Sequence, residues 1–139
     1  MRWVLDTNVV ASALLWGGTP AQLLDAAQQG EVELFSSRAL VGELAGILDR
    51  AKFARAIEAT QLSIGDLIQA YLGLVSLVQP DHVPPVVAAD PADDHVLACA
   101  VAAHADAIVS GDRHLHALGG VYQGVVILRP AQALQMLAM

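Results

Sequence analysis

The stretch RWVLDTNVVASALL, residues 2–15, places a short apolar run, Trp3 to Leu5, directly before an acid and a helical pattern. The same order recurs along the chain, with VELF before SSRALVGELAGILDR, DAIVS before a short segment, and VVIL before PAQALQMLAM. Repeated strand and helix patterns predict an α/β fold in which the strands form a parallel sheet. The acid that ends the first strand, Asp6, needs a separate explanation.

Length and cysteine content favour one domain in a reducing compartment. The chain has 139 residues, a single-domain length covering residues 1–139, and its lone cysteine, Cys99, has no disulfide partner. No uncharged stretch approaches the roughly 18 apolar residues of a membrane span, and Asp6 interrupts the apolar core that a signal peptide needs. We therefore expect a soluble, cytoplasmic protein without a membrane segment.

The charge balance argues against a passive nucleic-acid binder. The net charge is −7, and the seven Lys and Arg residues are scattered, whereas affinity for a polyanion normally comes from clustered basic residues. Acidity is compatible with a nuclease whose carboxylates hold divalent cations, because bound ions reverse the local field. A content of 55% hydrophobic residues also predicts an exposed apolar patch, covered by a second copy in a homodimer or by a partner protein.

The middle of the chain predicts a helical insertion and an extended connection. Residues 52–78 carry apolar side chains at three- and four-residue steps, which indicates helix throughout. Residues 79–91 contain four of the six prolines and predict an extended segment that leads into a helix beginning near Asp93. The parts on either side are too small for independent cores, so one domain is expected.

Acidic residues follow the predicted strands in four separate segments. Asp6 ends the first strand, and Asp112 follows another within two or three residues. Glu43 lies about two turns into the helix after VELF, and Asp93 and Asp94 open the helix DDHVLACAVAAHA. Because open α/β sheets bind ligands beyond the carboxyl ends of their strands, these acids are expected along one edge.

Each acid by itself has a structural explanation. Asp6 and Asp112 can cap the helices that follow them, Asp93 or Asp94 can favour a helix N-terminus, and Glu43 can be a solvated surface residue. Together, carboxylates without a compensating Lys or Arg repel one another and raise their pKa values, unless hard cations neutralise them. Clustered oxygen ligands suit Mg²⁺ or Mn²⁺, which keep waters that exchange with phosphate oxygens. The pattern therefore indicates phosphate chemistry.

The order and spacing of four segments carry a resemblance to a known family. The segments are VLDTNVV, SSRALVGELAGIL, DPADDHVLACAVAAHADAIVSGD and VVILRPAQALQML, and together they span nearly the whole chain. With them the chain resembles the PIN-domain family of metal-dependent ribonucleases, especially the toxin-like branch of bacterial toxin–antitoxin pairs. The order of these segments is more specific than any single motif.

The resemblance assigns roles to individual residues. The four family acids correspond to Asp6, Glu43, Asp94 and Asp112, which are then the expected catalytic and metal-binding residues. Asp94 is preferred to Asp93 because the family pattern of an acid, two residues, then aliphatic and small residues reads here as DHVLACA. The supporting roles fall to Asn8, Ser110 and Asp93 as groups that orient ligands or water, and to Arg113 as a phosphate contact.

The resemblance also implies a fold and a reaction. The fold is a three-layer α/β/α sandwich with a central, mainly parallel sheet, in which residues 52–78 form the family's variable region. The reaction is hydrolysis of RNA phosphodiester bonds by a water that one or two Mg²⁺ or Mn²⁺ ions activate. An antitoxin protein is the expected partner, and RNA is the expected substrate.

Two alternatives compete with this interpretation. A phosphatase of the haloacid-dehalogenase type shares a strand-end aspartate, a strand-end serine (Ser36) and a later GD sequence, but it needs a second acid where this chain has Asn8. A catalytically silent interaction module, whose acids bind structural metal or nothing, is the other alternative. The ribonuclease hypothesis requires that the acids meet in space.

Overall fold

The computed structural model describes residues 1–139 and contains one six-stranded sheet. Its strands lie in the order β3-β2-β1-β4-β6-β5. Their bounds are β1 Arg2–Leu5, β2 Glu33–Ser36, β3 Val75–Leu77, β4 Ala107–Val109, β5 Val121–Tyr122 and β6 Val125–Leu128. Neighbouring strands pair in parallel except β5, which is antiparallel to β6. The predicted mainly parallel sheet is therefore confirmed.

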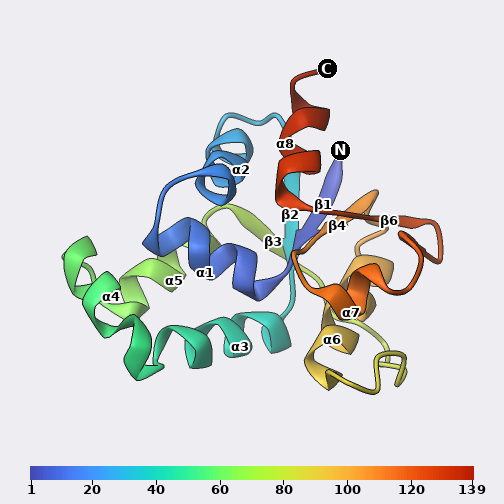
Figure 1. Cartoon of the computed structure of the whole chain (residues 1–139), viewed down its shortest axis with the longest axis horizontal. Helices are drawn as coiled ribbons and strands as arrows, with labels where there is room; N and C mark the ends of the chain where they lie inside the picture. Colours follow the sequence, from blue (N-terminus) through green and yellow to red (C-terminus); the bar gives the residue numbers. More distant parts are fainter.

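Eight α-helices flank this sheet in an α/β sandwich (Figure 1). They are α1 Thr7–Leu15, α2 Thr19–Gln28, α3 Arg38–Leu48, α4 Ala54–Thr60, α5 Ile64–Leu72, α6 Pro91–Ala102, α7 Arg113–His116 and α8 Pro130–Leu137, with a short 3₁₀ helix, η1 Ala51–Phe53. One apolar cluster joins a face of the sheet to α1, α2, α3, α5 and α8, and a second joins the opposite face to α6 and α7. No helix has both the length and the apolar character needed to span a bilayer.

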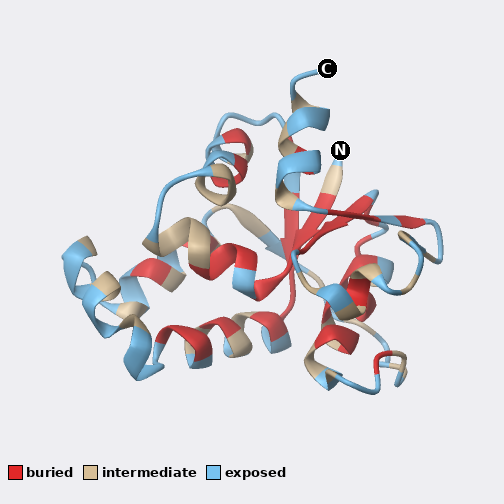
Figure 2. Ribbon diagram, viewed as in Figure 1, coloured by how far each residue is buried: buried red, intermediate tan, exposed pale blue.

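Strand β1 shows why this sequence forms a buried parallel sheet. Trp3 and Leu5 belong to the first apolar cluster, whereas Val4, between them, belongs to the second. Successive side chains of a strand point to opposite faces, so a strand covered on both faces is apolar throughout. Figure 2 accordingly shows the central strands coloured as buried.

The prediction of helix throughout residues 52–78 is wrong at its end. Helices fill most of this region, but Val75–Leu77 forms β3, which pairs in parallel with β2 at the edge of the sheet. Gly73 ends α5, and the apolar spacing continues through it without a visible break in the sequence. Three residues are too few to show the two-residue alternation of apolar and polar side chains that marks a strand. Val75–Leu77 is a strand only because it pairs with β2.

The order in which strands are added to the sheet changes direction between β1 and β4. It runs outward from β1 to β2 and β3, then returns to place β4 and β6 on the other side of β1. The register pairs Leu5 with Val109, so the carboxyl ends of β1 and β4 lie side by side. Open α/β sheets bind ligands at such reversal points. Asp6 and the turn 110–112 follow these two ends directly.

Candidate metal centre

Asp6 occupies the junction between β1 and α1. Its backbone N–H continues the sheet by donating to the carbonyl of Val109 at 2.9 Å. Its side chain is only 3% exposed and does not cap α1, although the residue stands at the N-cap position. The capping explanation therefore does not account for this carboxylate, which faces the neighbouring strand end instead.

The turn after β4 is built around Ser110, whose side chain is fully buried. Ser110 Oγ donates to Asp6 Oδ2 at 2.7 Å and accepts from the Asp112 backbone N–H at 2.9 Å. The His116 ring lies with Nε2 2.6 Å from the Ser110 carbonyl oxygen, which ties α7 to the same turn. Asp112 Oδ1 caps α7 by accepting from the His114 N–H at 2.6 Å. The predicted cap is thus present, and Asp112 retains a second oxygen for other contacts.

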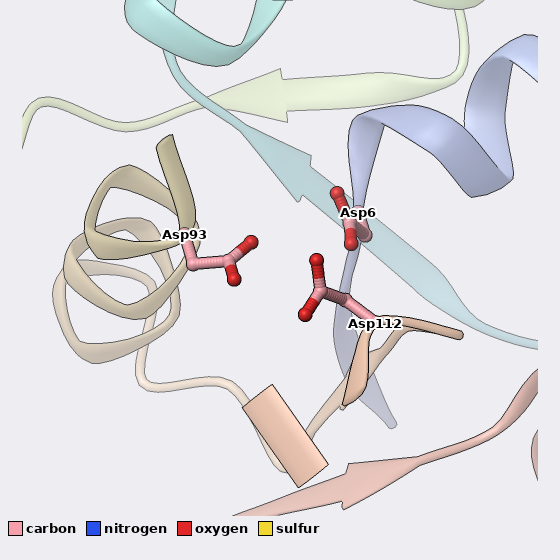
Figure 3. A group of neighbouring side chains, drawn as sticks. All are labelled: Asp6, Asp93 and Asp112. Atoms are coloured by element: carbon pink, nitrogen blue, oxygen red, sulfur yellow. The ribbon is translucent and has the colours of Figure 1, made fainter. Parts of the chain in front are cut away.

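Helix α6 brings a third aspartate to these two. The helix begins after Asp90, whose side chain accepts from the Ala92 N–H, and Asp93 lies in its first turn. One oxygen from each of Asp6, Asp93 and Asp112 lies within 4.8 Å of the others (Figure 3). The three side chains converge from β1, α6 and the turn after β4.

Burial and the neighbouring carboxylates perturb the ionisation of Asp6 and Asp93. Burial, followed by the charges of Asp112, Asp90 and Asp6, raises the pKa of Asp93 to about 8. Burial also raises the pKa of Asp6, and the charge of Asp112 adds to that shift against an opposing hydrogen bond from Ser110. No Lys or Arg contributes to either shift. The negative charge gathered here is thus left without a basic partner from the chain.

The donor set fits a hard divalent cation. Asp93 Oδ2 is buried and has no hydrogen-bond partner, although unpaired buried polar atoms are rare because they are costly. Three carboxylates supply the oxygen ligands that Mg²⁺ and Mn²⁺ prefer. A bound cation would both neutralise the cluster and give Asp93 Oδ2 a partner.

Glu43 lies beside this group but is not one of its three members. It projects from α3, and its carboxylate accepts a hydrogen bond from Thr7 Oγ1 at 2.7 Å. Burial raises the pKa of Glu43 most, and the charges of Asp6 and Asp90 raise it further. The charge of Asp6 reaches Glu43, so the predicted second acid lies next to the centre.

Asp94 does not face the three-carboxylate group. Its Oδ1 accepts from the backbone N–H groups of Val86 and Val87 at 3.0 and 2.7 Å. Consecutive residues of a helix point about 100° apart, so only one of Asp93 and Asp94 can face Asp6. In the structure Asp93 takes that position, and Asp94 instead holds the proline-rich segment onto α6.

Of the remaining predicted residues, Asn8 lines a pocket at the site, and Arg113 follows Asp112 in the sequence. A pocket of ≈ 380 Å³ is lined by Asp6, Asn8, Val9, Ser12, Pro20, Gly111, Asp112 and Pro130. Asn8 is exposed there, and Arg113 is exposed at the start of α7. Thr7 is the residue that the sequence interpretation missed. Its position directly after Asp6 was visible in LDTNVV, but its partner Glu43 is 36 residues away.

A family model and the VapBC2 crystal structure agree with this architecture. A family model described as a PIN domain matches residues 2–114. The crystal structure of VapBC2 from Rickettsia felis bound to a DNA fragment from their promoter gives a TM-score of 0.62 at 12% identity, over 93% of this chain and 98% of that chain. FitAcB from Neisseria gonorrhoeae gives a TM-score of 0.49 at 22% identity, with the same coverage. No curated protein sequence matches the chain.

Proposed function

The chain belongs to the PIN-domain family, and on that premise we propose that it is a metal-dependent ribonuclease that hydrolyses RNA phosphodiester bonds. The observation that carries the proposal is the convergence of Asp6, Asp93 and Asp112 without a basic partner. A divalent cation would balance the negative charge of such a cluster, and Mg²⁺ or Mn²⁺ at such a site acts on phosphate esters.

The residues divide into those that would hold the cation and those that support them. Asp6, Asp93 and Asp112 would hold Mg²⁺ or Mn²⁺, with Glu43 at their side. When bound, such a cation lowers the pKa of water and neutralises charge on phosphate oxygens. Ser110 orients Asp6 through its 2.7 Å hydrogen bond. This assignment replaces Asp94 by Asp93 as the third acid.

Asn8, which lines the pocket, and Arg113, which follows Asp112, would meet the substrate. Asn8 lines the pocket that leads to Asp6 and Asp112, where its amide can donate to a water or to a phosphate oxygen. Arg113 is exposed beside Asp112, and we propose that its guanidinium contacts a phosphate of the RNA strand. Both roles are additions to the acid cluster, and neither is needed for cation binding.

The proposed biological setting is a toxin paired with an antitoxin in the cytoplasm. The support is the resemblance of the sequence to the toxin-like branch and the fold shared with the VapBC2 structure. A homodimer is proposed because large apolar side chains stay about half exposed, among them Trp16, Leu77 and Val121. An adjacent reading frame encoding a DNA-binding protein that blocks cleavage would support the pairing, and light scattering of the purified chain would test the dimer.

The central test is cleavage of a mixed-sequence RNA by the purified chain without a partner. We expect cleavage with Mn²⁺ or Mg²⁺, none with EDTA, and none by Asp6→Asn. Asp25→Asn removes one exposed acid far from the cluster along the chain and serves as the charge-matched control. If RNA stays intact across a wide Mn²⁺ range and Mn²⁺ gives no thermal stabilisation, the silent interaction module replaces the nuclease.

No observation favours the phosphatase alternative. The residue two positions after Asp6 is Asn8, which cannot protonate a leaving group, and the matching family model is the PIN domain. Trapping of a covalent phosphate on Asp6 during turnover would restore that alternative. Metal-dependent RNA cleavage without such an adduct excludes it.

A further inference from the structure

Thr7 is buried, and the only hydrogen-bond partners of its side-chain hydroxyl are carboxylates. It is 3% exposed and is the first residue of α1. Its Oγ1 lies 2.7 Å from Glu43 Oε1 and 3.4 Å from Asp6 Oδ1. A threonine near the start of a helix commonly bonds to nearby backbone groups, but this side chain bonds to an acid from another helix.

A hydroxyl group has one proton to donate. The short distance shows that Thr7 gives this proton to Glu43, because 2.7 Å is typical of an O–H···O bond and 3.4 Å is longer than such bonds. The bond from Thr7 is also the one side-chain hydrogen bond of Glu43 in the structure. Thr7 is therefore the one hydrogen-bond partner that holds the Glu43 carboxylate near Asp6.

The contact with Thr7 matters because the Glu43 side chain is long and comes from a different helix, α3. Its flexible side chain extends from α3, whereas the three aspartates belong to the ends of β1 and β4 and to α6. Charge repulsion from Asp6 acts to turn the Glu43 carboxylate away from the centre. A donor fixed on the residue next to Asp6 opposes that movement and holds the two acids together.

We propose that Thr7 is a positioning residue that holds Glu43 against the metal centre, so that Glu43 contributes to cation binding only through its bond with Thr7. This inference rests on the proposed function, since it concerns the same acidic site. In this proposal three aspartates lie close together without help from Thr7, whereas the glutamate is held near them by its hydrogen bond with Thr7. It also gives Thr7, which lies between Asp6 and Asn8 in the sequence, a role at the site.

Mn²⁺ binding by calorimetry tests the proposal in wild type and four variants. Thr7→Val keeps the shape of the side chain but removes the hydroxyl, and Thr7→Ser keeps the hydroxyl as the matched control. We expect Thr7→Val and Glu43→Gln each to weaken Mn²⁺ binding by about tenfold, the size typical of groups that orient ligands, and Thr7→Ser to bind like wild type. The double variant should bind no more weakly than Glu43→Gln alone, because Thr7 acts through Glu43.

Circular dichroism shows whether each variant folds, and Thr7→Ala replaces Thr7→Val if the valine does not fit. Wild-type affinity in the hydroxyl-free variant overturns the proposal, and so do losses that multiply in the double variant. Asp6→Asn separates this result from the proposed function. If Asp6→Asn binds Mn²⁺ like wild type, the metal centre itself fails, whereas loss in Asp6→Asn with no change in Thr7→Val overturns the role of Thr7 alone.

Discussion

Ser110 Oγ donates a 2.7 Å hydrogen bond to Asp6 Oδ2 and so joins the carboxyl ends of β1 and β4. These are the two parallel strands between which the order of strand addition changes direction. The same oxygen accepts from the Asp112 N–H, so one hydroxyl positions two of the three clustered acids. The geometry of the site therefore depends on a neutral side chain as well as on the carboxylates.

Removing this hydroxyl should weaken both the fold and the site. Ser110→Ala deletes both hydrogen bonds in a buried place, and we expect a loss of about 1–3 kcal/mol in the free energy of unfolding, measured with urea. Mn²⁺ affinity should fall as well, because Asp6 and Asp112 lose their common support. Ser76→Ala, at an exposed position of β3, is the matched control. Unchanged stability and affinity in Ser110→Ala would show that this hydroxyl does not organise the site.

Substitutions of Asp93 and Asp94 should have different effects, because Asp93 would bind the cation and Asp94 holds the segment 86–87 onto α6. Asp93→Asn is expected to lose most of the thermal stabilisation that Mn²⁺ gives, because Asp93 faces the other two acids. Asp94→Asn should retain that stabilisation, since an amide oxygen can still accept from Val86 and Val87. Asp94→Ala should lower the free energy of unfolding by about 1–3 kcal/mol, because two backbone donors lose their acceptor. The reverse order, with Asp94→Asn losing the Mn²⁺ effect, would restore Asp94 as the third acid.

The metal-free protein should lose stability as pH rises. The pKa of Asp93 is about 8 in the folded protein against 3.8 for an ordinary aspartate, so between these values the folded state holds a proton that the unfolded state has released. The free energy of unfolding then falls with rising pH over this window, by at most about 1.4 kcal/mol per pH unit for one proton. The raised pKa values of Asp6 and Glu43 act in the same direction.

Urea unfolding in EDTA at a series of pH values measures this slope. Asp93→Asn should flatten it, whereas Asp25→Asn, which also removes one negative charge, should leave it in place. Stabilisation by Mn²⁺ should grow over the same window, because cation binding needs the carboxylates deprotonated. Stability that rises from pH 4 to pH 8 in EDTA would be inconsistent with a buried, protonated Asp93.

Strands and most helices could be predicted because their signals are local. Apolar runs such as residues 3–5 and the proline starts of α2 and α8 each lie within a few residues of chain, whereas α6 begins at Pro91, slightly before the expected start near Asp93. Strand β3 could not be predicted, because three residues become a strand only by pairing with β2. The acids at strand ends could be anticipated for the same topological reason that brings β1 and β4 together.

Details of the site depend on contacts between distant segments. The family pattern favours Asp94 over Asp93, but the direction of the two side chains follows from the packing of α6 and the return of Val86 and Val87 to its first turn. The role of Thr7 could not be predicted from the sequence, because it depends on a hydrogen bond to Glu43 on α3. Sequence position therefore indicates which segments meet, whereas side-chain direction requires the folded chain.

Cleavage of a labelled mixed-sequence RNA by wild type, Asp93→Asn and Asp94→Asn, in Mn²⁺ and in EDTA, tests the central claim most directly. The account predicts cleavage by wild type in Mn²⁺ alone, retained cleavage by Asp94→Asn, and a loss of at least about 100-fold for Asp93→Asn, the scale expected when an essential electrostatic group is removed. Cleavage that persists in EDTA, or that survives in Asp93→Asn, would contradict a metal-dependent site built on Asp6, Asp93 and Asp112.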